Sequence, residues 1–269
     1  MRWAAVIGDP VEHSLSPAIH NRAYSDLGLD IEYRAITVSV TQGRKFLRNL
    51  PSDCVGLSVT MPLKQEIIPE IHYLDGLARV TGVVNTVVPG AGGLSGFNTD
   101  SYGIQTAVTE TTGPDFTPKT VAILGGRATA SSALAAATAL HAERIEIYAR
   151  SFSGAGSVAS AAARMGVLPE YRPLNHKTAA QLAYADLIIS TLPAGVADRY
   201  CVGLKTEAPI LDAAYYPWPS KLAECSDNPI PGTRMLLHQA VAQIRLFTSR
   251  TPDVARMDEA LTAQLGRRK

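Results

Sequence analysis

The sequence predicts an α/β protein of two lobes, the second of which contains a parallel sheet. Short apolar segments typical of buried strands alternate with helical patterns through the first hundred residues, and the alternation begins again at Thr120. The length of 269 residues is too great for one minimal domain and suits one large or two modest α/β domains. A hydrophobic fraction of 46% is enough for each lobe to have a full core.

The first lobe begins with a buried strand over Trp3–Gly8. Ser16 and Pro17 predict a helix start, since a hydroxyl N-cap is followed by proline in the first turn, and Gly28 predicts its end. The further elements are a strand over Ile31–Val38, a helix over Thr41–Leu50, a strand over Cys54–Val59, and strands over Val83–Val88 and Leu94–Asn98 joined by the turn Pro89–Gly93.

The second lobe opens with a buried strand over Thr120–Leu124, which runs into Gly125 and Gly126. An Ala-rich helix over Thr129–His141 and a strand over Arg144–Ala149 follow. This order is the first unit of a dinucleotide-binding sheet, so we expect a Rossmann-type lobe. The pattern continues with a helix over Ser157–Met165 and strands over Asp186–Ser190 and Pro209–Asp212.

The last section is helical. Apolar residues from Met235 to Phe247 share one helix face, and a second helix spans Pro252–Leu265. We expect residues 1–99, completed by helices within 233–269, to form the substrate-binding and catalytic domain. Residues 100–232 would form the dinucleotide-binding domain, with a cleft between the two.

Charge and composition exclude several classes. The net charge is +1 without a basic stripe, so we expect no nucleic-acid partner. No segment approaches the ~20 apolar residues of a membrane span, and the N-terminus lacks a signal-peptide pattern. The three widely spaced cysteines, Cys54, Cys201 and Cys225, predict no disulfide framework and a reducing compartment. The prediction is a cytoplasmic protein, with no metal site because no convincing ligand cluster is present.

Ser14 and Ser16 precede the first predicted helix as a Ser-x-Ser pair. Two hydroxyls at this spacing, helped by the helix dipole, could bind a carboxylate. The alternative is that Ser16 only caps the helix.

Lys64, Asn85 and Asp100 each follow the end of an apolar segment. Together they supply a cation, an amide and a carboxylate, which suits proton transfer to a substrate oxygen. Taken singly, Lys64 reads as a solvated lysine, and Asn85 and Asp100 read as turn residues.

These motifs together resemble shikimate dehydrogenases. They include the Ser14-x-Ser16 pair, Val59-Thr60-x-Pro62-x-Lys64, Val84-Asn85-Thr86 and Asn98-Thr99-Asp100. The carboxyl half agrees, with Asp212-x-x-Tyr215 and Gly232-x-x-Met235-Leu236-x-x-Gln239. The resemblance covers nearly the whole chain, and the motifs occur in the family's order and spacing.

The resemblance implies reversible reduction of 3-dehydroshikimate to shikimate with NADPH, a step of chorismate and aromatic amino acid biosynthesis. Lys64 resembles the catalytic lysine and Asp100 its paired carboxylate. The implied substrate-binding residues are Ser14, Ser16, Thr60, Asn85, Tyr215 and Gln239. The implied NADP-binding residues are Gly125, Gly126, Arg127, Ala128, Arg150, Ser151, Thr191, Gly232 and Met235.

The sequence departs from the family pattern at Ser58 and at Arg127. Ser58 stands where members usually have asparagine, and its hydroxyl can still form hydrogen bonds. Arg127 stands where the second glycine of the Gly-x-Gly-Gly-x-Ala turn lets the backbone approach the pyrophosphate. Two interpretations of Arg127 stay open: its side chain obstructs or reorganises the turn, or its guanidinium binds a phosphate.

The segment Ala149-Arg150-Ser151 favours NADP over NAD. Arg150 can pair with the 2′-phosphate, and an NAD enzyme would more often have an acidic residue at this strand end. A further basic residue is often found a few positions later, where this chain has Gly154.

Two rival functions also stay open. One is a quinate or quinate/shikimate dehydrogenase that uses NAD, and the other is a non-catalytic relative that still binds the ligand. In each case we expect a small-molecule partner, and a homodimer is compatible with the sequence.

Overall fold

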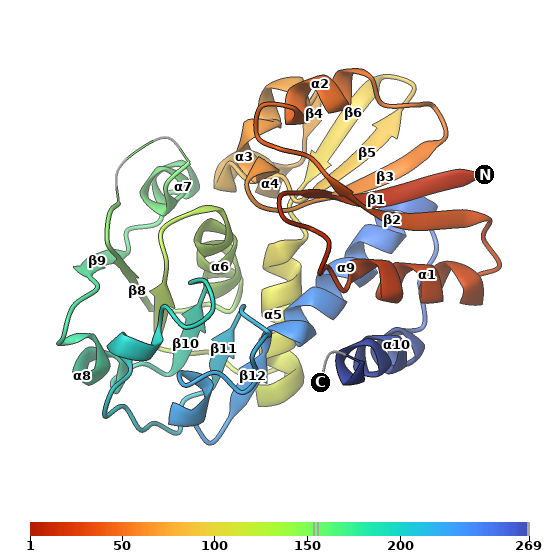
Figure 1. The fold of residues 1–269 in the computed structure, drawn as a ribbon. Coiled ribbons are helices and arrows are strands. Elements are labelled where there is room, and N and C mark those ends of the chain that lie inside the picture. Colours follow the sequence, from red (N-terminus) through yellow and green to blue (C-terminus); the bar gives the residue numbers. More distant parts are fainter. Residues whose placement is uncertain (153, 155, 268–269) are drawn as a thin grey trace. The chain divides into compact units, whose positions relative to one another are not determined.

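The computed structural model describes residues 1–152, 154 and 156–267. The chain forms two compact units: unit 1 comprises Met1–Thr99 and Leu236–Lys269, and unit 2 comprises Asp100–Met235. The last two residues of the section predicted to complete the substrate domain, Arg268 and Lys269, lie outside the described residues. Helix α9, Gly232–Thr248, begins in unit 2 and continues into unit 1 (Figure 1).

Unit 1 is built on a six-stranded mixed sheet with the strand order β2-β1-β3-β5-β6-β4. β1 pairs in parallel with β2 and β3, whereas β5 runs antiparallel to β3 and β6. The strands are β1 (Arg2–Gly8), β2 (Ile31–Thr37), β3 (Cys54–Val59), β4 (Tyr73–Leu74), β5 (Thr86–Gly90) and β6 (Gly93–Phe97).

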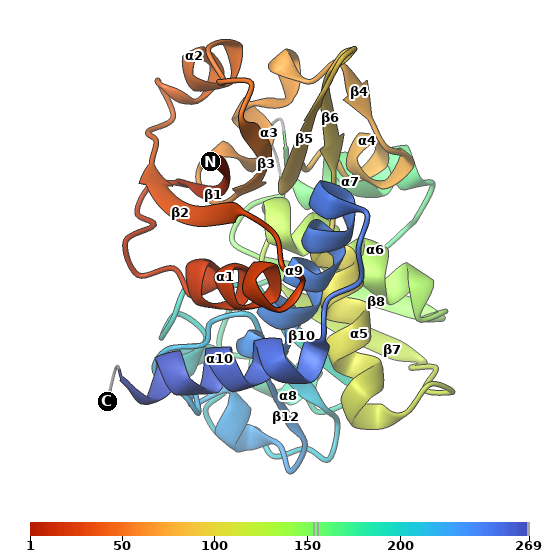
Figure 2. The same cartoon turned by 90° about the vertical axis from the view of Figure 1, so that its right-hand side faces the viewer.

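Helices cover both faces of this sheet (Figures 1 and 2). On one face Trp3, Ala5 and Ile7 of β1 share a core with side chains of α2, α3 and α4. On the other face α9 packs directly on β3, since a Cβ added to Gly56 would lie 2.1 Å from the Phe247 ring. The helices are α1 (Ser16–Asp26), α2 (Gly43–Arg48), α3 (Leu63–Glu66), η1 (Ile68–Glu70), α4 (Gly76–Thr81) and α10 (Val254–Gly266).

Unit 2 contains a six-stranded sheet with the order β12-β11-β10-β7-β8-β9, and every neighbouring pair is parallel. This is the order of a doubly wound dinucleotide-binding sheet, so the predicted α/β fold with a parallel Rossmann-type sheet is confirmed. The strands are β7 (Thr120–Leu124), β8 (Arg144–Ala149), β9 (Glu170–Pro173), β10 (Leu187–Ser190), β11 (Ile210–Asp212) and β12 (Pro229–Pro231).

Alternate strand residues of this sheet serve two separate cores. Val121 and Ile123 face a core with α5, α6 and α7, while Ala122 and Leu124 face a core with α8. A strand buried on both faces is apolar throughout, which is why these strands were evident in the sequence. The helices are α5 (Asp100–Thr112), α6 (Ala128–Ala139), α7 (Val158–Met165), α8 (Thr178–Leu182), η2 (Asp198–Tyr200) and η3 (Ala223–Cys225).

The start of α1 differs from the prediction. Ser16 is the first residue of the helix rather than its N-cap, which is Leu15. The Ser16 amide donates to the Ser14 hydroxyl oxygen at 3.2 Å, so Ser14 satisfies the first amide of the helix.

The strand predicted over Val83–Val88 begins only at Thr86. Gly82 ends α4 with φ +66°, and the Val84 amide then donates to the Lys64 carbonyl at 2.8 Å instead of to a strand. The sequence analysis also missed β4, β9 and β12, which are short edge strands with little apolar patterning.

His20 is fully buried on α1 and stacks on Tyr33 of β2 with ring centroids 4.0 Å apart. Its Nδ1 donates to the Ser16 carbonyl at 2.9 Å, since a carbonyl can only accept. Burial lowers the pKa of His20 to about 4, against the opposing hydrogen bonds with Ser16 and Gln243. The imidazole is therefore neutral in the folded protein at neutral pH.

This burial predicts a loss of stability in acid. Because the folded pKa is lowered, the unfolded chain binds a proton at His20 between pH 6.5 and about 4, and the folded chain does not. The stabilisation is present above pH 6.5 and is lost as the pH falls to about 4, by about 3 kcal/mol. Urea unfolding of the wild type and of His20→Phe, measured across this window, should show a weaker pH dependence for the variant. If the free energy of unfolding depends on pH equally in the two proteins, the lowered pKa of His20 is contradicted.

Candidate functional site

Lys64 and Asn85 are brought together at the end of β3. Lys64 lies in α3, and its carbonyl accepts the Val84 amide at 2.8 Å. The Asn85 carbonyl accepts the Val59 amide at 2.7 Å, and the Thr60 amide donates to Ile7 of β1 at 2.9 Å. The segment Thr60–Lys64 and the distant residue Asn85 therefore meet where β1 and β3 end.

The Asn85 side chain has one orientation imposed by its neighbours. Its Oδ1 accepts the Thr99 amide at 2.7 Å and the Thr86 hydroxyl at 2.9 Å, and its Nδ2 donates to Thr99 Oγ1 at 2.9 Å. The side chain is only 2% exposed. Asn85 lies in a bend immediately before β5, and its side chain is buried and hydrogen-bonded, so it is more than a turn residue.

Gln243 of α9 was not recognised from the sequence. Its Nε2 donates to Thr86 Oγ1 at 3.0 Å and to the Asn85 carbonyl at 3.3 Å, and its Oε1 accepts the Ser58 hydroxyl at 2.7 Å. It is 1% exposed. The available signal was its position four residues after Gln239, on the helix face that otherwise carries apolar side chains.

Ser58 uses its hydroxyl within the protein. It donates to Gln243 and accepts from the Tyr33 hydroxyl at 2.5 Å. Tyr33 also forms a hydrogen bond with Ser16, and burial raises the Tyr33 pKa, so its hydroxyl stays protonated. One hydrogen-bonded chain thus connects α1, β2, β3 and α9 on a single face of the sheet.

The other predicted substrate residues are divided between the units. Ser14 is half-buried, and Gln239 of unit 1 donates to the Leu236 carbonyl at 2.8 Å within α9. Asp100 and the half-buried Tyr215 belong to unit 2. Asp100 is buried as the first residue of α5, where the helix dipole stabilises a carboxylate.

In unit 2, Gly125 lies at the turn from β7 to α6, as predicted. It has φ +128°, and a Cβ there would lie 2.1 Å from Thr191 Oγ1. Thr191 follows β10, and its amide and hydroxyl both donate to the Leu124 carbonyl, at 2.8 and 2.9 Å. The two residues lie where β7 and β10 are neighbours, the point at which the chain order of a doubly wound sheet reverses and dinucleotides bind.

Arg127 fits this turn without strain. Its backbone is extended, with φ −117° and ψ −159°, a conformation that does not require glycine. Gly126 beside it is more constrained, because a Cβ there would lie 3.1 Å from both the Ala149 Cβ and the Ser151 carbonyl. Arg127 therefore does not reorganise the turn. Of the first interpretation, only obstruction of the cofactor by the Arg127 side chain stays open.

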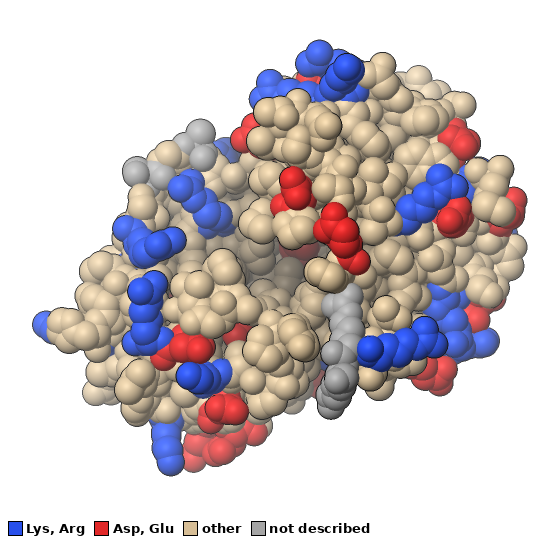
Figure 3. Space-filling view, in the orientation of Figure 1, with Lys and Arg blue, Asp and Glu red and all other residues tan. Residues whose placement is uncertain are grey.

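Arg150 and Ser151 follow β8 and are exposed. In the view of Figure 3, the surface of unit 2 around α7 and the connection before it shows Lys and Arg rather than Asp and Glu. The chain has no acidic residue from Ile147 to Pro169.

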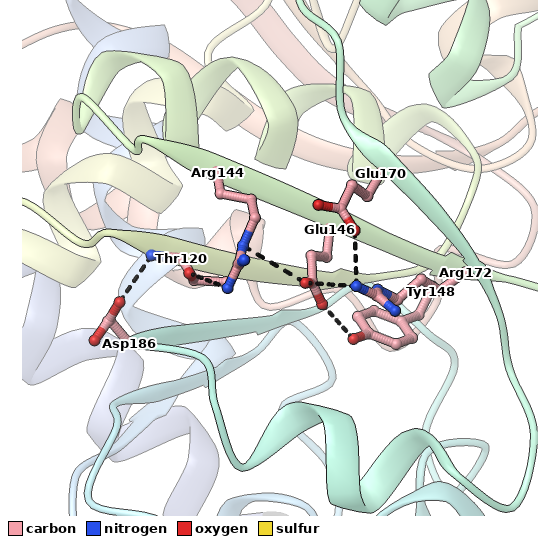
Figure 4. A network of polar contacts seen from close by, with 7 residues as sticks. All are labelled: Thr120, Arg144, Glu146, Tyr148, Glu170, Arg172 and Asp186. Atoms are coloured by element: carbon pink, nitrogen blue, oxygen red, sulfur yellow. Dashed lines mark hydrogen bonds and ion pairs between the residues drawn. The ribbon is translucent and has the colours of Figure 1, made fainter.

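The acidic residues closest to this connection in sequence are engaged elsewhere on the sheet (Figure 4). Glu146 of β8 accepts from the Tyr148 hydroxyl at 2.5 Å and pairs with Arg172 at 3.1 Å. Arg172 also pairs with Glu170 at 2.7 Å. These pairs neutralise the carboxylates, so the end of β8 carries the positive charge of Arg150 without a competing acid.

The structure explains why Asp212 and Gly232 occupy their positions. Asp212 accepts from Ser220 Oγ at 2.7 Å and from the Ala214 amide at 3.2 Å, and burial raises its pKa. A Cβ on Gly232 would lie 2.5 Å from the Ala213 carbonyl, so only glycine fits there. Met235 is buried in the core of unit 2.

Among the described residues, no group of three or more His, Cys, Asp or Glu side chains is arranged to hold a metal ion. No helix in the described ranges is long and apolar enough to cross a membrane.

Comparison with known proteins gives consistent matches. Residues 6–87 match the model of the shikimate dehydrogenase substrate binding domain, and residues 232–262 match that of the shikimate 5′-dehydrogenase C-terminal domain. A shikimate dehydrogenase (NADP(+)) of Geobacter sp. strain M21 is 33% identical over 277 residues, covering 98% of this chain and 96% of the relative.

Solved structures that resemble this chain are also shikimate dehydrogenases. The shikimate dehydrogenase of Mycobacterium tuberculosis is 30% identical with a TM-score of 0.86, covering 98% of this chain and all of that one. A shikimate 5-dehydrogenase of Thermus thermophilus in complex with NADP(H) and shikimate is 27% identical with a TM-score of 0.79, covering 98% and 100%.

The buried contacts of Gln243 lead to a stability prediction. Gln243→Leu should lower the free energy of unfolding by about 1–3 kcal/mol, because Ser58 and the Asn85 carbonyl lose a buried partner. Gln264→Leu on the half-exposed part of α10 is the matched control and should change it by less than about 0.5 kcal/mol. If urea unfolding shows the same change in the free energy of unfolding for both variants, the hydrogen bonds of Gln243 do not contribute to stability.

Proposed function

This chain belongs to the shikimate dehydrogenase family, and on that premise we propose that it catalyses the reversible, NADPH-dependent reduction of 3-dehydroshikimate to shikimate. The observation that carries the proposal is the meeting of Lys64 and Asn85 at the end of β3, through the hydrogen bond between the Val84 amide and the Lys64 carbonyl. This bond holds the Lys64 backbone next to the segment of the fixed Asn85 amide, and a cation and an amide together would suit a substrate oxygen that gains negative charge.

Lys64 is the proton donor in this proposal. Hydride addition to the carbonyl carbon leaves negative charge on the oxygen, and an ammonium group stabilises that charge and donates the proton. Asp100 acts with Lys64 as the paired carboxylate. In the reverse direction Lys64 accepts the proton from the alcohol, so one residue serves both directions.

Most of the proposed substrate-binding residues belong to unit 1 and the proposed NADP-binding residues to unit 2, whereas Asp100 and Tyr215 belong to unit 2. Asn85 presents its amide in the orientation imposed by Thr99 and Thr86. The remaining groups proposed to hold the carboxylate and hydroxyls are those of Ser14, Ser16, Thr60, Tyr215 and Gln239.

The residues of unit 2 fit a phosphate-bearing dinucleotide. Gly125 has a positive φ at the sheet position where dinucleotides bind, and Arg150 follows β8 with no acidic residue after it before Glu170. NADPH, when bound, supplies the hydride. Gly125, Gly126, Arg127, Ala128, Arg150, Ser151, Thr191, Gly232 and Met235 would hold it.

The proposal places the enzyme in chorismate and aromatic amino acid biosynthesis, in the cytoplasm, with a small molecule as its partner. The three cysteines are all free thiols in the structure, which supports a reducing compartment. The proposed assembly is a monomer or a homodimer, to be distinguished by sedimentation.

The purified protein should reduce NADP with shikimate, as followed by absorbance at the NADPH band, and should prefer this pair to quinate and to NAD. The preference rests on Arg150, which can bind the 2′-phosphate that NAD lacks. Faster turnover with quinate and NAD would assign the chain to quinate oxidation. Shikimate binding without turnover of either cofactor would identify a non-catalytic relative.

Lys64→Ala should lower kcat by a factor on the order of 10²–10⁴, whereas the KM for shikimate should change much less. The reason is that Lys64 faces charge that develops mainly in the transition state. Asp100→Asn should give the same profile. Ser14→Ala should mainly raise KM, because the substrate carboxylate does not change during the reaction.

The matched control is Lys45→Ala, which removes an exposed lysine of α2 and should leave both constants near wild type. Near-normal kcat with a raised KM in Lys64→Ala would make Lys64 a binding residue and would require another proton donor. Circular dichroism should show that each variant is folded.

A further inference from the structure

We infer that Arg127 is a specificity-determining residue that binds the 2′-phosphate of NADP together with Arg150. This inference rests on the proposed function, and it decides between the two interpretations of Arg127. Arg127 would take over the task that a basic residue performs at the position of Gly154 in other members of the family.

The position of the Arg127 side chain is the main observation. Its Nη1 lies 3.9 Å from the point where a Cβ on Gly154 would be. Arg127 thus extends from the turn after β7 to the connection after β8, at the residue where this chain lacks a basic side chain. Gly154 itself has φ +100°, which strongly disfavours a side chain there.

The connection after β7 and the connection after β8 are packed against each other. The closeness of Arg127 to Gly154 therefore follows from contacts between the two connections. The Val158 amide donates to the Gly126 carbonyl at 3.0 Å, and Gly126 lies close to the Ser151 carbonyl. The connection that begins with Arg150 is therefore held beside the residue that precedes Arg127. Arg127 and Arg150 therefore belong to two connections that are packed together.

Charge in this region favours an anion. The chain has no acidic residue in 121–142 or in 147–169. Within the described part of the chain, Arg127 and Arg150 form no ion pair, whereas Arg144 and Arg172 are paired with Glu146. Both guanidinium groups are exposed and available to a phosphate, and Figure 3 shows the basic character of this surface.

The direction of the Arg127 side chain favours the 2′-phosphate of NADP over the pyrophosphate as its ligand. A side chain that served the pyrophosphate would stay over Gly125 and the start of α6, where the backbone amides point. Arg127 instead reaches Gly154, on the side of Arg150 and Ser151. A planar guanidinium with several donors is suited to a terminal phosphate with three free oxygens.

The test is calorimetric binding of two fragments to the full-length protein. Adenosine 2′,5′-bisphosphate carries the 2′-phosphate, and adenosine 5′-monophosphate lacks it. Arg127→Gln should weaken binding of the bisphosphate about tenfold or more and change binding of the monophosphate less than about twofold. Arg150→Gln should give the same pattern, Arg127→Lys should retain part of the affinity, and the matched control Lys119→Gln should resemble wild type.

Four results would overturn the inference. Arg127→Gln could leave both fragments unaffected, or could weaken both equally, which would place Arg127 at the phosphate that the fragments share. Arg127→Gly could tighten binding of the bisphosphate, which would identify Arg127 as an obstruction. If wild type does not prefer the bisphosphate at all, NADP selectivity in the proposed function fails, and the inference fails with it.

Discussion

The buried side chain of Gln243 joins helix α9 to the central strands of unit 1. It is hydrogen-bonded to Ser58 at the end of β3, to Thr86 at the start of β5 and to the carbonyl of Asn85. A helix from the end of the chain thereby fixes the segment that contains Asn85, and Asn85 in turn follows the residue that is hydrogen-bonded to Lys64. Buried amides left without partners would cost free energy, so these contacts are made together or not at all.

A comparable constraint operates in unit 2, where the Thr191 hydroxyl occupies the space that a side chain on Gly125 would need. Thr191 bonds twice to the Leu124 carbonyl and so fixes the register at which β7 and β10 end. The turn after β7 must therefore begin with glycine at a positive φ. The residue two positions later is under no such restriction, and this explains how the fold accepts Arg127 where the family has glycine.

Both departures from the family pattern acquire a partner that is distant in the sequence. Ser58, in place of asparagine, is bonded between Tyr33 and Gln243, so its hydroxyl is engaged inside unit 1. Arg127, in place of glycine, lies beside Gly154, where a basic residue is missing. Each departure is better understood together with its distant partner than as the loss of a motif, and one pair lies in unit 1 and the other in unit 2.

The sequence alone determined the fold class, the strands β3, β7 and β8 with their bounds, and the family. Strands buried on both faces are apolar throughout and are bounded by glycine or turn residues, so their pattern is local. The sequence could not show that Asn85 lies beside Lys64, that Gln243 joins β3 to β5, or that Arg127 reaches Gly154. These relations arise where strand ends and connections from distant parts of the chain pack together, and no local periodicity records them. Only the tertiary structure decided which polar side chains of the motifs face one another, because hydrogen bonds depend on distances that sequence separation does not contain.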